Sequence, residues 1–256
     1  MTFLRPLLVF GGLGLLGILS LIPSLGPAIE HIQHLPGTPP LSDRALAAIL
    51  LLQPSLLLFA AVAVGIALAE RTGLVSLLLR RSRGQALRAD GGGWGQALFL
   101  AALAAAVAAA ADLVLRRLSP ASFTGIPRLD DVTLPGRVMA LLYGGVAEEL
   151  MIRFGLMTLL LWLGMKLLRG RRPPWLVWLA IVLASLAFAA GHLPALVGMT
   201  QPDTVLILRT VALNGALGLL YGWLYASRTL EHAMLAHMAT HVVFWTATPL
   251  FAALGL

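Results

Sequence analysis

The stretch GGVAEELMIRFG, from Gly144 to Gly155, lies inside an apolar run at about 136–163. Two adjacent carboxylates, Glu148 and Glu149, and the guanidinium of Arg153 interrupt this run. Ionisable groups inside the hydrocarbon region of a membrane cost free energy, so they usually face the interior of a helix bundle and mark a functional site. The stretch therefore predicts a transmembrane helix that carries chemistry.

The composition extends this prediction to the whole chain. Of its 256 residues, 59% are hydrophobic and 11% are charged, whereas a soluble domain is about one-quarter charged. Apolar runs near the roughly 20 residues needed to cross a bilayer recur, without the alternation typical of a barrel. We predict an all-α, polytopic transmembrane bundle with the catalytic core in the last four of about seven spans. These lie at about 4–26, 44–69, 95–117, 136–163, 175–198, 205–226 and 232–254.

Two regions are expected along the chain. Residues 1–135 would form N-terminal transmembrane helices and a cytoplasmic basic loop, and residues 136–256 would form the catalytic helical core. The first apolar run is longer than a usual signal sequence and no clear cleavage site follows it, so we interpret it as a retained helix.

Basic residues predict the orientation. They are densest in the loops at 70–94 and 166–174, and such loops face the cytoplasm, which puts the N-terminus there too. All but one of the 18 basic residues are arginine, so we expect a bacterial protein of the inner (plasma) membrane. The segment 71–90 holds either a short amphipathic helix that meets lipid headgroups or a simple anchor. The net charge of +7 does not indicate nucleic-acid binding, because no basic domain stands outside the membrane.

Carboxylates and an arginine in the fourth span form the first part of the candidate site. Glu149 and Arg153 are four residues apart, so they can pair along one helix face. Glu148 points about 100° away, and a carboxylate without a partner in a medium of low dielectric constant readily accepts a proton, as a general base must. The alternative is a purely structural cluster. Asp112 and Arg116 have the same spacing, and we assign them a structural ion pair.

Three histidines form the second part. His192 follows Phe188 by four residues, just before a proline; it is either a site residue or a core histidine bonded to a neighbour. His237 and His241 share one face of the last span, which packing alone does not explain. His232 would lie at the membrane interface.

One carboxylate and three imidazoles from three helices can polarise a water and stabilise an oxyanion. The absence of cysteine excludes thiol catalysis, and no serine-nucleophile or HExxH motif competes.

Three motifs resemble those of the CPBP family, the type II CAAX prenyl endopeptidases and related bacteriocin-processing (Abi-like) proteins. They are Glu148-Glu149-Leu-Met-Ile-Arg153, Phe188-Ala-Ala-Gly-His192 and His237-Met-Ala-Thr-His241. The resemblance covers about residues 136–254. It implies that Glu148 and His192 activate the attacking water, that His237 and His241 stabilise the oxyanion, and that Glu149, Arg153 and Phe188 support the site. It also implies a membrane-tethered or amphipathic peptide as substrate.

One departure from the family leaves alternatives open. His241 stands where the family usually has Asn or Asp, and Glu148, His192, His237 and His241 would together make a plausible Zn²⁺ site. The chain could also be a non-catalytic membrane scaffold or bacteriocin immunity protein, which would bind its partner without Glu148. A transporter or proton relay is a third reading, because Glu and His chains serve there too.

Overall fold

The computed structural model describes residues 3–35, 41–86 and 92–256. Within these residues all regular structure is helical, as predicted. Short 3₁₀ turns are η1 and η2, and π-helical segments are η3 and η4. In chain order the elements are α1 (Leu4–Leu19), η1 (Ile22–Ser24), α2 (Gly26–Gln33), α3 (Asp43–Thr72), α4 (Leu77–Ser82), α5 (Trp94–Leu118), η2 (Pro120–Phe123), α6 (Leu134–Met139), η3 (Ala140–Glu148), η4 (Leu150–Met157), α7 (Thr158–Leu167), α8 (Pro174–Gly191), α9 (Leu193–Met199), α10 (Thr204–Ser227) and α11 (Leu230–Ala253).

The described residues contain six helical stretches that are long and apolar enough to cross a membrane, so the chain is a multi-pass membrane protein. The predicted count of seven is not confirmed. The seventh expected span, α11, has 24 residues, but its histidines and threonines make it less apolar and it is not among the six. These are Leu4–Ser24, Asp43–Thr72, Trp94–Leu118, Leu134–Leu167, Pro174–Met199 and Thr204–Ser227.

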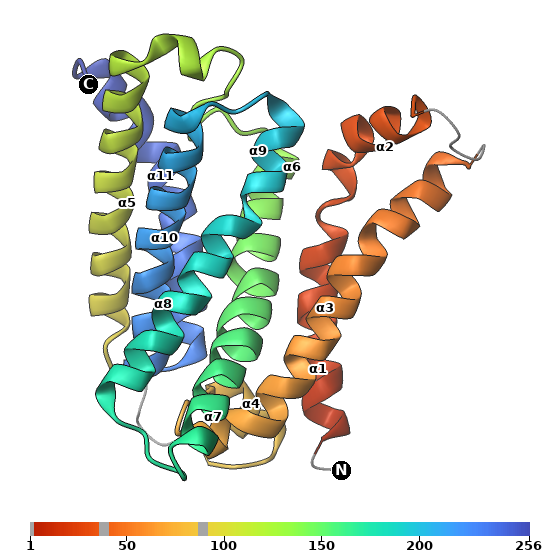
Figure 1. The fold of residues 1–256 in the computed structure, drawn as a ribbon, viewed down its shortest axis with the longest axis vertical. Coiled ribbons are helices and arrows are strands. Elements are labelled where there is room, and N and C mark those ends of the chain that lie inside the picture. The colour runs from red at the N-terminus through yellow and green to blue at the C-terminus, as the bar shows by residue number, and fades with distance from the viewer. Residues whose placement is uncertain (1–2, 36–40, 87–91) are drawn as a thin grey trace.

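The helices run roughly side by side, and α1 and α3 lean away from the others towards one end (Figure 1). α1 begins and α11 ends at opposite ends of the bundle (Figure 1). Local sequence sets several boundaries. The side chains of Ser42 and Asp203 accept hydrogen bonds from the first turns of α3 and α10, and Gly73, with φ +74°, ends α3 in the left-handed conformation that glycine adopts without strain.

Small residues let α3 approach the fourth membrane stretch closely. A Cβ added to Gly65 would overlap the ring of Phe154, and one added to Gly155 would overlap the Cβ of Ala61. Phe154 also stacks on Phe10 of α1, with ring centroids 4.8 Å apart. The N-terminal helices are therefore packed directly on the helix that carries Glu148, Glu149 and Arg153.

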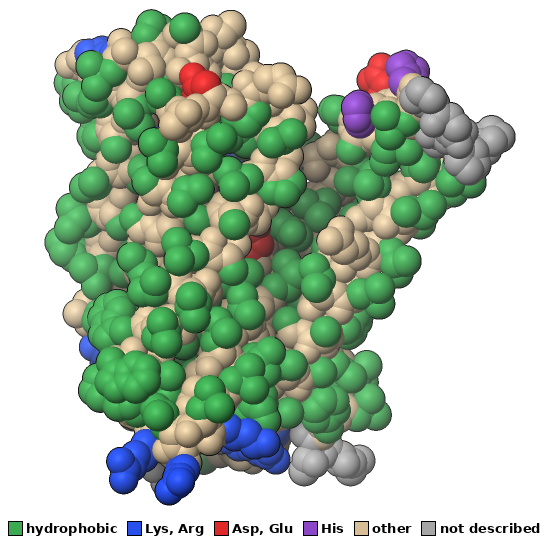
Figure 2. Space-filling view, in the orientation of Figure 1, with side chains coloured by type: hydrophobic (Ala, Val, Ile, Leu, Met, Phe, Trp, Pro, Cys, Tyr) green, Lys and Arg blue, Asp and Glu red, His purple; other side chains and the backbone are tan. Residues whose placement is uncertain are grey.

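Basic side chains gather at one end of the molecule, where α4 and the loop between α7 and α8 lie (Figures 1 and 2). Of the two alternatives for residues 71–90, a short helix is present as α4. Glu231, at the start of α11, accepts hydrogen bonds from the hydroxyl of Ser76 at 2.6 Å and from the backbone N–H groups of Leu77 at 3.0 Å and Leu78 at 2.9 Å. The first turn of α4 is thus fastened to α11.

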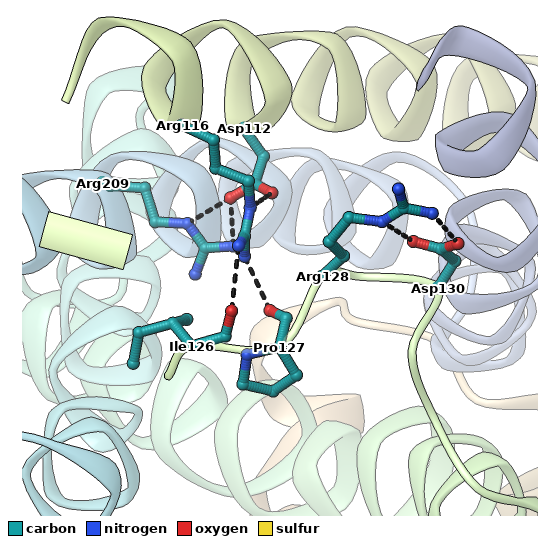
Figure 3. Close-up of polar contacts among 7 residues, drawn as sticks. All are labelled: Asp112, Arg116, Ile126, Pro127, Arg128, Asp130 and Arg209. Atoms are coloured by element: carbon teal, nitrogen blue, oxygen red, sulfur yellow. Dashed lines mark hydrogen bonds and ion pairs between the residues drawn. The ribbon is translucent and has the colours of Figure 1, made fainter. Parts of the chain in front are cut away.

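A buried ion cluster lies near the other end (Figure 3). The predicted pair of Asp112 and Arg116 is confirmed at 2.8 Å, and Arg209 of α10 adds a second partner, with its Nε 2.7 Å from Asp112 Oδ1. Arg116 also donates to the carbonyls of Ile126 at 2.9 Å and Pro127 at 2.6 Å. The cluster holds the connection after α5 against α5 and α10.

Candidate active site

The carboxylates lie on a helix that is wound more widely than predicted. Residues 140–148 and 150–157 form π-helix, in which each N–H bonds to the carbonyl five residues back; such turns are rare and frequent at functional sites. The predicted α-helical spacing is wrong here, because periodicity alone does not reveal the wider winding of a π-helix. Glu149 is fully buried in this segment, whereas Glu148 is half-buried.

Glu149 and Arg153 together connect three helices. The predicted ion pair with Arg153 is present, with Arg153 Nη1 3.2 Å from Glu149 Oε1. The same oxygen lies 2.8 Å from Nδ1 of His237 on α11. Arg153 also donates from Nη2 to the carbonyl of Gly218 on α10, at 3.1 Å. The network offsets part of the cost of burying these charges.

Two aromatic rings complete the surroundings of Arg153. Its guanidinium carbon lies 4.5 Å from the ring centroid of Phe188 and 5.3 Å from that of Tyr221. Ring faces attract a cation, most strongly where water is excluded. Phe188, expected as a supporting residue, therefore contacts the ion pair directly.

His237 is held on several sides. Its ring stacks on Tyr221, with centroids 4.5 Å apart and planes 17° apart, and on His241, with centroids 5.1 Å apart. A Cβ placed on Gly144 would lie 3.0 Å from His241 Nε2 and 3.5 Å from His237 Nε2. The Nε2 atoms of both histidines therefore converge beside Gly144, on the helix that carries Glu148.

Glu148 and His192 line the same cavity, of about 720 Å³. His192 Nδ1 lies 2.8 Å from the carbonyl oxygen of Phe188. Because a carbonyl can only accept, Nδ1 must donate, and the neutral ring keeps a lone pair on Nε2. The ring of Phe188 makes edge contacts with both His192 (4.7 Å) and His237 (5.6 Å), so it links the two histidines.

The cavity lies between α3 and the helices that carry the site. Its walls come from α3, the π-helical segment, α7, α8 and α9. The surface is hollowed between α3 and the rest of the bundle (Figure 2). A substrate could therefore reach Glu148 and His192 from this side.

The structure brings the candidate residues together as two neighbouring groups. Glu148 and His192 border the cavity, whereas His237 and His241 do not and lie beside Gly144 and Glu149. Among the described residues, no three His, Asp or Glu side chains are placed to hold one metal ion. Glu148, His192, His237 and His241 therefore do not form a ready ligand set for Zn²⁺ in the described residues.

Sequence reasoning missed some of the contacts. Tyr221 stacks on His237 and its hydroxyl donates to Thr240 at 2.8 Å, but nothing in the sequence around Tyr221 distinguishes it from a core tyrosine. The stacking partner of His232 was also missed: in the first turn of α11 this histidine is buried and stacks on Trp94, with centroids 3.7 Å apart.

Residues 131–243 match the family model of the Rce1-like type II CAAX prenyl endopeptidases. Comparisons with curated proteins and with solved structures give no match. The matched range contains all three motifs, from Glu148 to His241, and the helices that bring them together. Residues 131–243 are therefore similar to the Rce1-like type II CAAX prenyl endopeptidases, a protease family, and this match is consistent with the CPBP resemblance of the motifs.

Proposed function

We propose that the protein is an intramembrane endopeptidase that hydrolyses a peptide bond of a membrane-tethered or amphipathic peptide. The observation that carries the proposal is that Glu148 and His192 line one cavity within an otherwise apolar helix bundle. The family match supports the reaction class.

In the proposed mechanism, Glu148 and His192 hold the attacking water. The lone pair on His192 Nε2 accepts a hydrogen bond from the water, and the Glu148 carboxylate accepts its proton as the oxygen attacks the scissile carbonyl. The proton then passes to the departing amine. General base catalysis of this kind typically contributes about 10²- to 10⁴-fold in rate.

His237 and His241 are proposed to stabilise the oxyanion. The contact between Glu149 and His237 Nδ1 fixes Nε2 as the atom that faces Gly144. When His237 carries a second proton, the carboxylate of Glu149 balances its charge and Nε2–H can donate to the oxyanion. His241 Nε2 also lies beside Gly144. Its imidazole would donate the hydrogen bond to the oxyanion that the family's usual Asn or Asp side chain provides. Glu149, Arg153 and Phe188 act as support.

We also propose the setting of the reaction. The protein would lie in the inner membrane of a bacterium with its N-terminus and basic end in the cytoplasm, because Lys and Arg side chains gather at that end (Figure 2). Residues 1–135 would support a catalytic core of residues 136–256. The bilayer would present the substrate.

The test is cleavage of membrane-associated peptides by purified protein in nanodiscs, followed by mass spectrometry. We expect Glu148→Gln and His192→Ala to slow cleavage at least about 100-fold. The matched controls are Glu30→Gln, on exposed α2, and His34→Ala, at the exposed residue that follows α2; both should cleave at the parent rate. Cleavage by both site variants at the parent rate would refute the proposal.

A further inference from the structure

The wall of the cavity opposite Glu148 and His192 contains a polar side chain. α3 contributes Gln53 to this wall, together with apolar residues such as Leu50 and Leu57. Gln53 is exposed, and within the described residues its amide makes no hydrogen bond. An unpaired amide in an apolar surrounding costs free energy. The amide of Gln53 would therefore be stabilised by a ligand that hydrogen-bonds to it.

A backbone acceptor lies beside the amide. In an α-helix the carbonyl of Leu50 would accept from the N–H of residue 54, but that residue is Pro54, which has no N–H. Leu50, Gln53 and Pro54 all line the cavity. One turn of α3 therefore offers a carbonyl acceptor without its usual partner and a side-chain amide that can both donate and accept.

We propose that Gln53, with the Leu50 carbonyl, binds the backbone of an extended substrate segment and positions it across from Glu148 and His192. A peptide unit offers one N–H donor and one C=O acceptor, which matches the carbonyl and the amide of this turn. This inference rests on the proposed function and adds the groups that bind the substrate chain.

The depth of Gln53 favours a peptide over a lipid. Gln53 is ten residues from the start of α3 at Asp43, which at 1.5 Å per residue is roughly 15 Å. Lipid headgroups lie at the membrane surface and acyl chains have no hydrogen-bonding groups. A peptide backbone provides donors and acceptors at this depth.

The chain contains no cysteine, so a single introduced thiol can report on the cavity without background. Leu57 lines the cavity one turn after Gln53. The experiment measures alkylation of Leu57→Cys by N-ethylmaleimide in nanodiscs, with a short peptide of alternating leucine and alanine as the competing probe. A second probe is the same peptide with its backbone nitrogens methylated.

We expect the unmethylated peptide to slow alkylation. Adding Gln53→Met, which keeps the side-chain length, should raise the peptide concentration for half-protection about five- to tenfold, as the loss of one hydrogen bond predicts. Adding Ser55→Ala should change nothing, because the Ser55 hydroxyl is already satisfied by the carbonyl of Leu51 at 2.7 Å. The methylated peptide should protect poorly in each protein.

Equal protection by the unmethylated and the methylated peptide overturns the inference. This comparison uses Leu57→Cys alone, so it does not depend on whether Gln53→Met folds. Unchanged protection in Gln53→Met, or no alkylation of Leu57→Cys, also overturns it. Alkylation does not depend on hydrolysis, so protection without cleavage of any peptide would contradict the protease proposal alone. Cleavage with an unchanged KM in Gln53→Met would contradict this inference alone.

Discussion

Replacing Asp112 by asparagine tests whether the buried ion cluster stabilises the bundle. Asp112 is fully buried and its two oxygens face Arg116 and Arg209, whose side chains are each 14% exposed. Asp112→Asn removes the negative charge and leaves both guanidinium groups without their anion. Removing one partner of a buried ion pair typically costs about 3–5 kcal/mol, and we expect a loss in this range.

The neighbouring surface pair provides a matched control. Arg128 lies 2.6 Å from Asp130 with its side chain 44% exposed (Figure 3), and exposed pairs contribute about 0.2–1 kcal/mol. Asp130→Asn should therefore have a small effect. The measurement is unfolding of each variant in mixed micelles titrated with sodium dodecyl sulfate, followed by the fluorescence of the six tryptophans.

A third variant separates the cost of unpaired buried charges from the loss of the ion cluster as a whole. Replacing Asp112, Arg116 and Arg209 together by leucine and methionine removes every charge of the cluster. Since apolar replacement of a whole buried ion cluster is often neutral or stabilising, this triple variant should be more stable than Asp112→Asn. The reasoning fails if Asp112→Asn loses no more stability than Asp130→Asn.

Four further outcomes are expected. Gly155→Ala would overlap the backbone of α3 and should cost about 1–3 kcal/mol by overpacking, whereas Gly12→Ala, which meets nothing within 4 Å, should not destabilise the bundle in the same titration. Tyr221→Phe, which keeps the stacked ring, should retain more of the peptidase kcat than Tyr221→Leu, with KM unchanged in both. Glu231→Gln should speed hydrogen exchange across the first turn of α4 without global unfolding, because that turn donates three hydrogen bonds to the carboxylate. Hydrogen bonds from Ser122 and the α10 backbone lower the pKa of Asp203 below its usual 3.8. The contribution of the Asp203 carboxylate to stability should therefore be full above pH 3.8 and should decline as the pH falls through the lowered pKa. Asp203→Asn should abolish that part of the pH dependence.

The sequence was sufficient for the fold class and for most helix boundaries. Long apolar runs separated by basic or proline-containing loops leave few alternatives, and six of the expected spans agree with the structure within a few residues. α11 is the instructive exception. The histidines that indicate a site on this helix also lower its hydropathy, so the same residues weaken the prediction that it spans the membrane.

Local spacing predicted local contacts and missed distant ones. The pairs Glu149–Arg153 and Asp112–Arg116 follow from a separation of four residues. The contact between Glu149 and His237 joins residues 88 positions apart, and that between Asp112 and Arg209 joins residues 97 apart. Such contacts depend on how the helices pack, which periodicity does not encode.

Polar groups without charge were also missed. Gln53 and the Leu50 carbonyl, whose usual helical donor is replaced by Pro54, carry no charge, so the pattern of ionisable residues did not indicate them. Both could have been found from the sequence, since an amide and a proline one residue apart inside an apolar run are unusual for a lipid-facing helix.

The π-helical winding of residues 140–157 makes this segment more sensitive to changes in length than to changes in side chain. Each backbone hydrogen bond of a π-helix spans one residue more than the corresponding bond of an α-helix. A single-residue deletion there would shift the hydrogen-bond register and would rotate every residue after the deletion relative to those before it. Homologues that share this architecture should therefore vary in residue identity along the segment while keeping its residue count fixed.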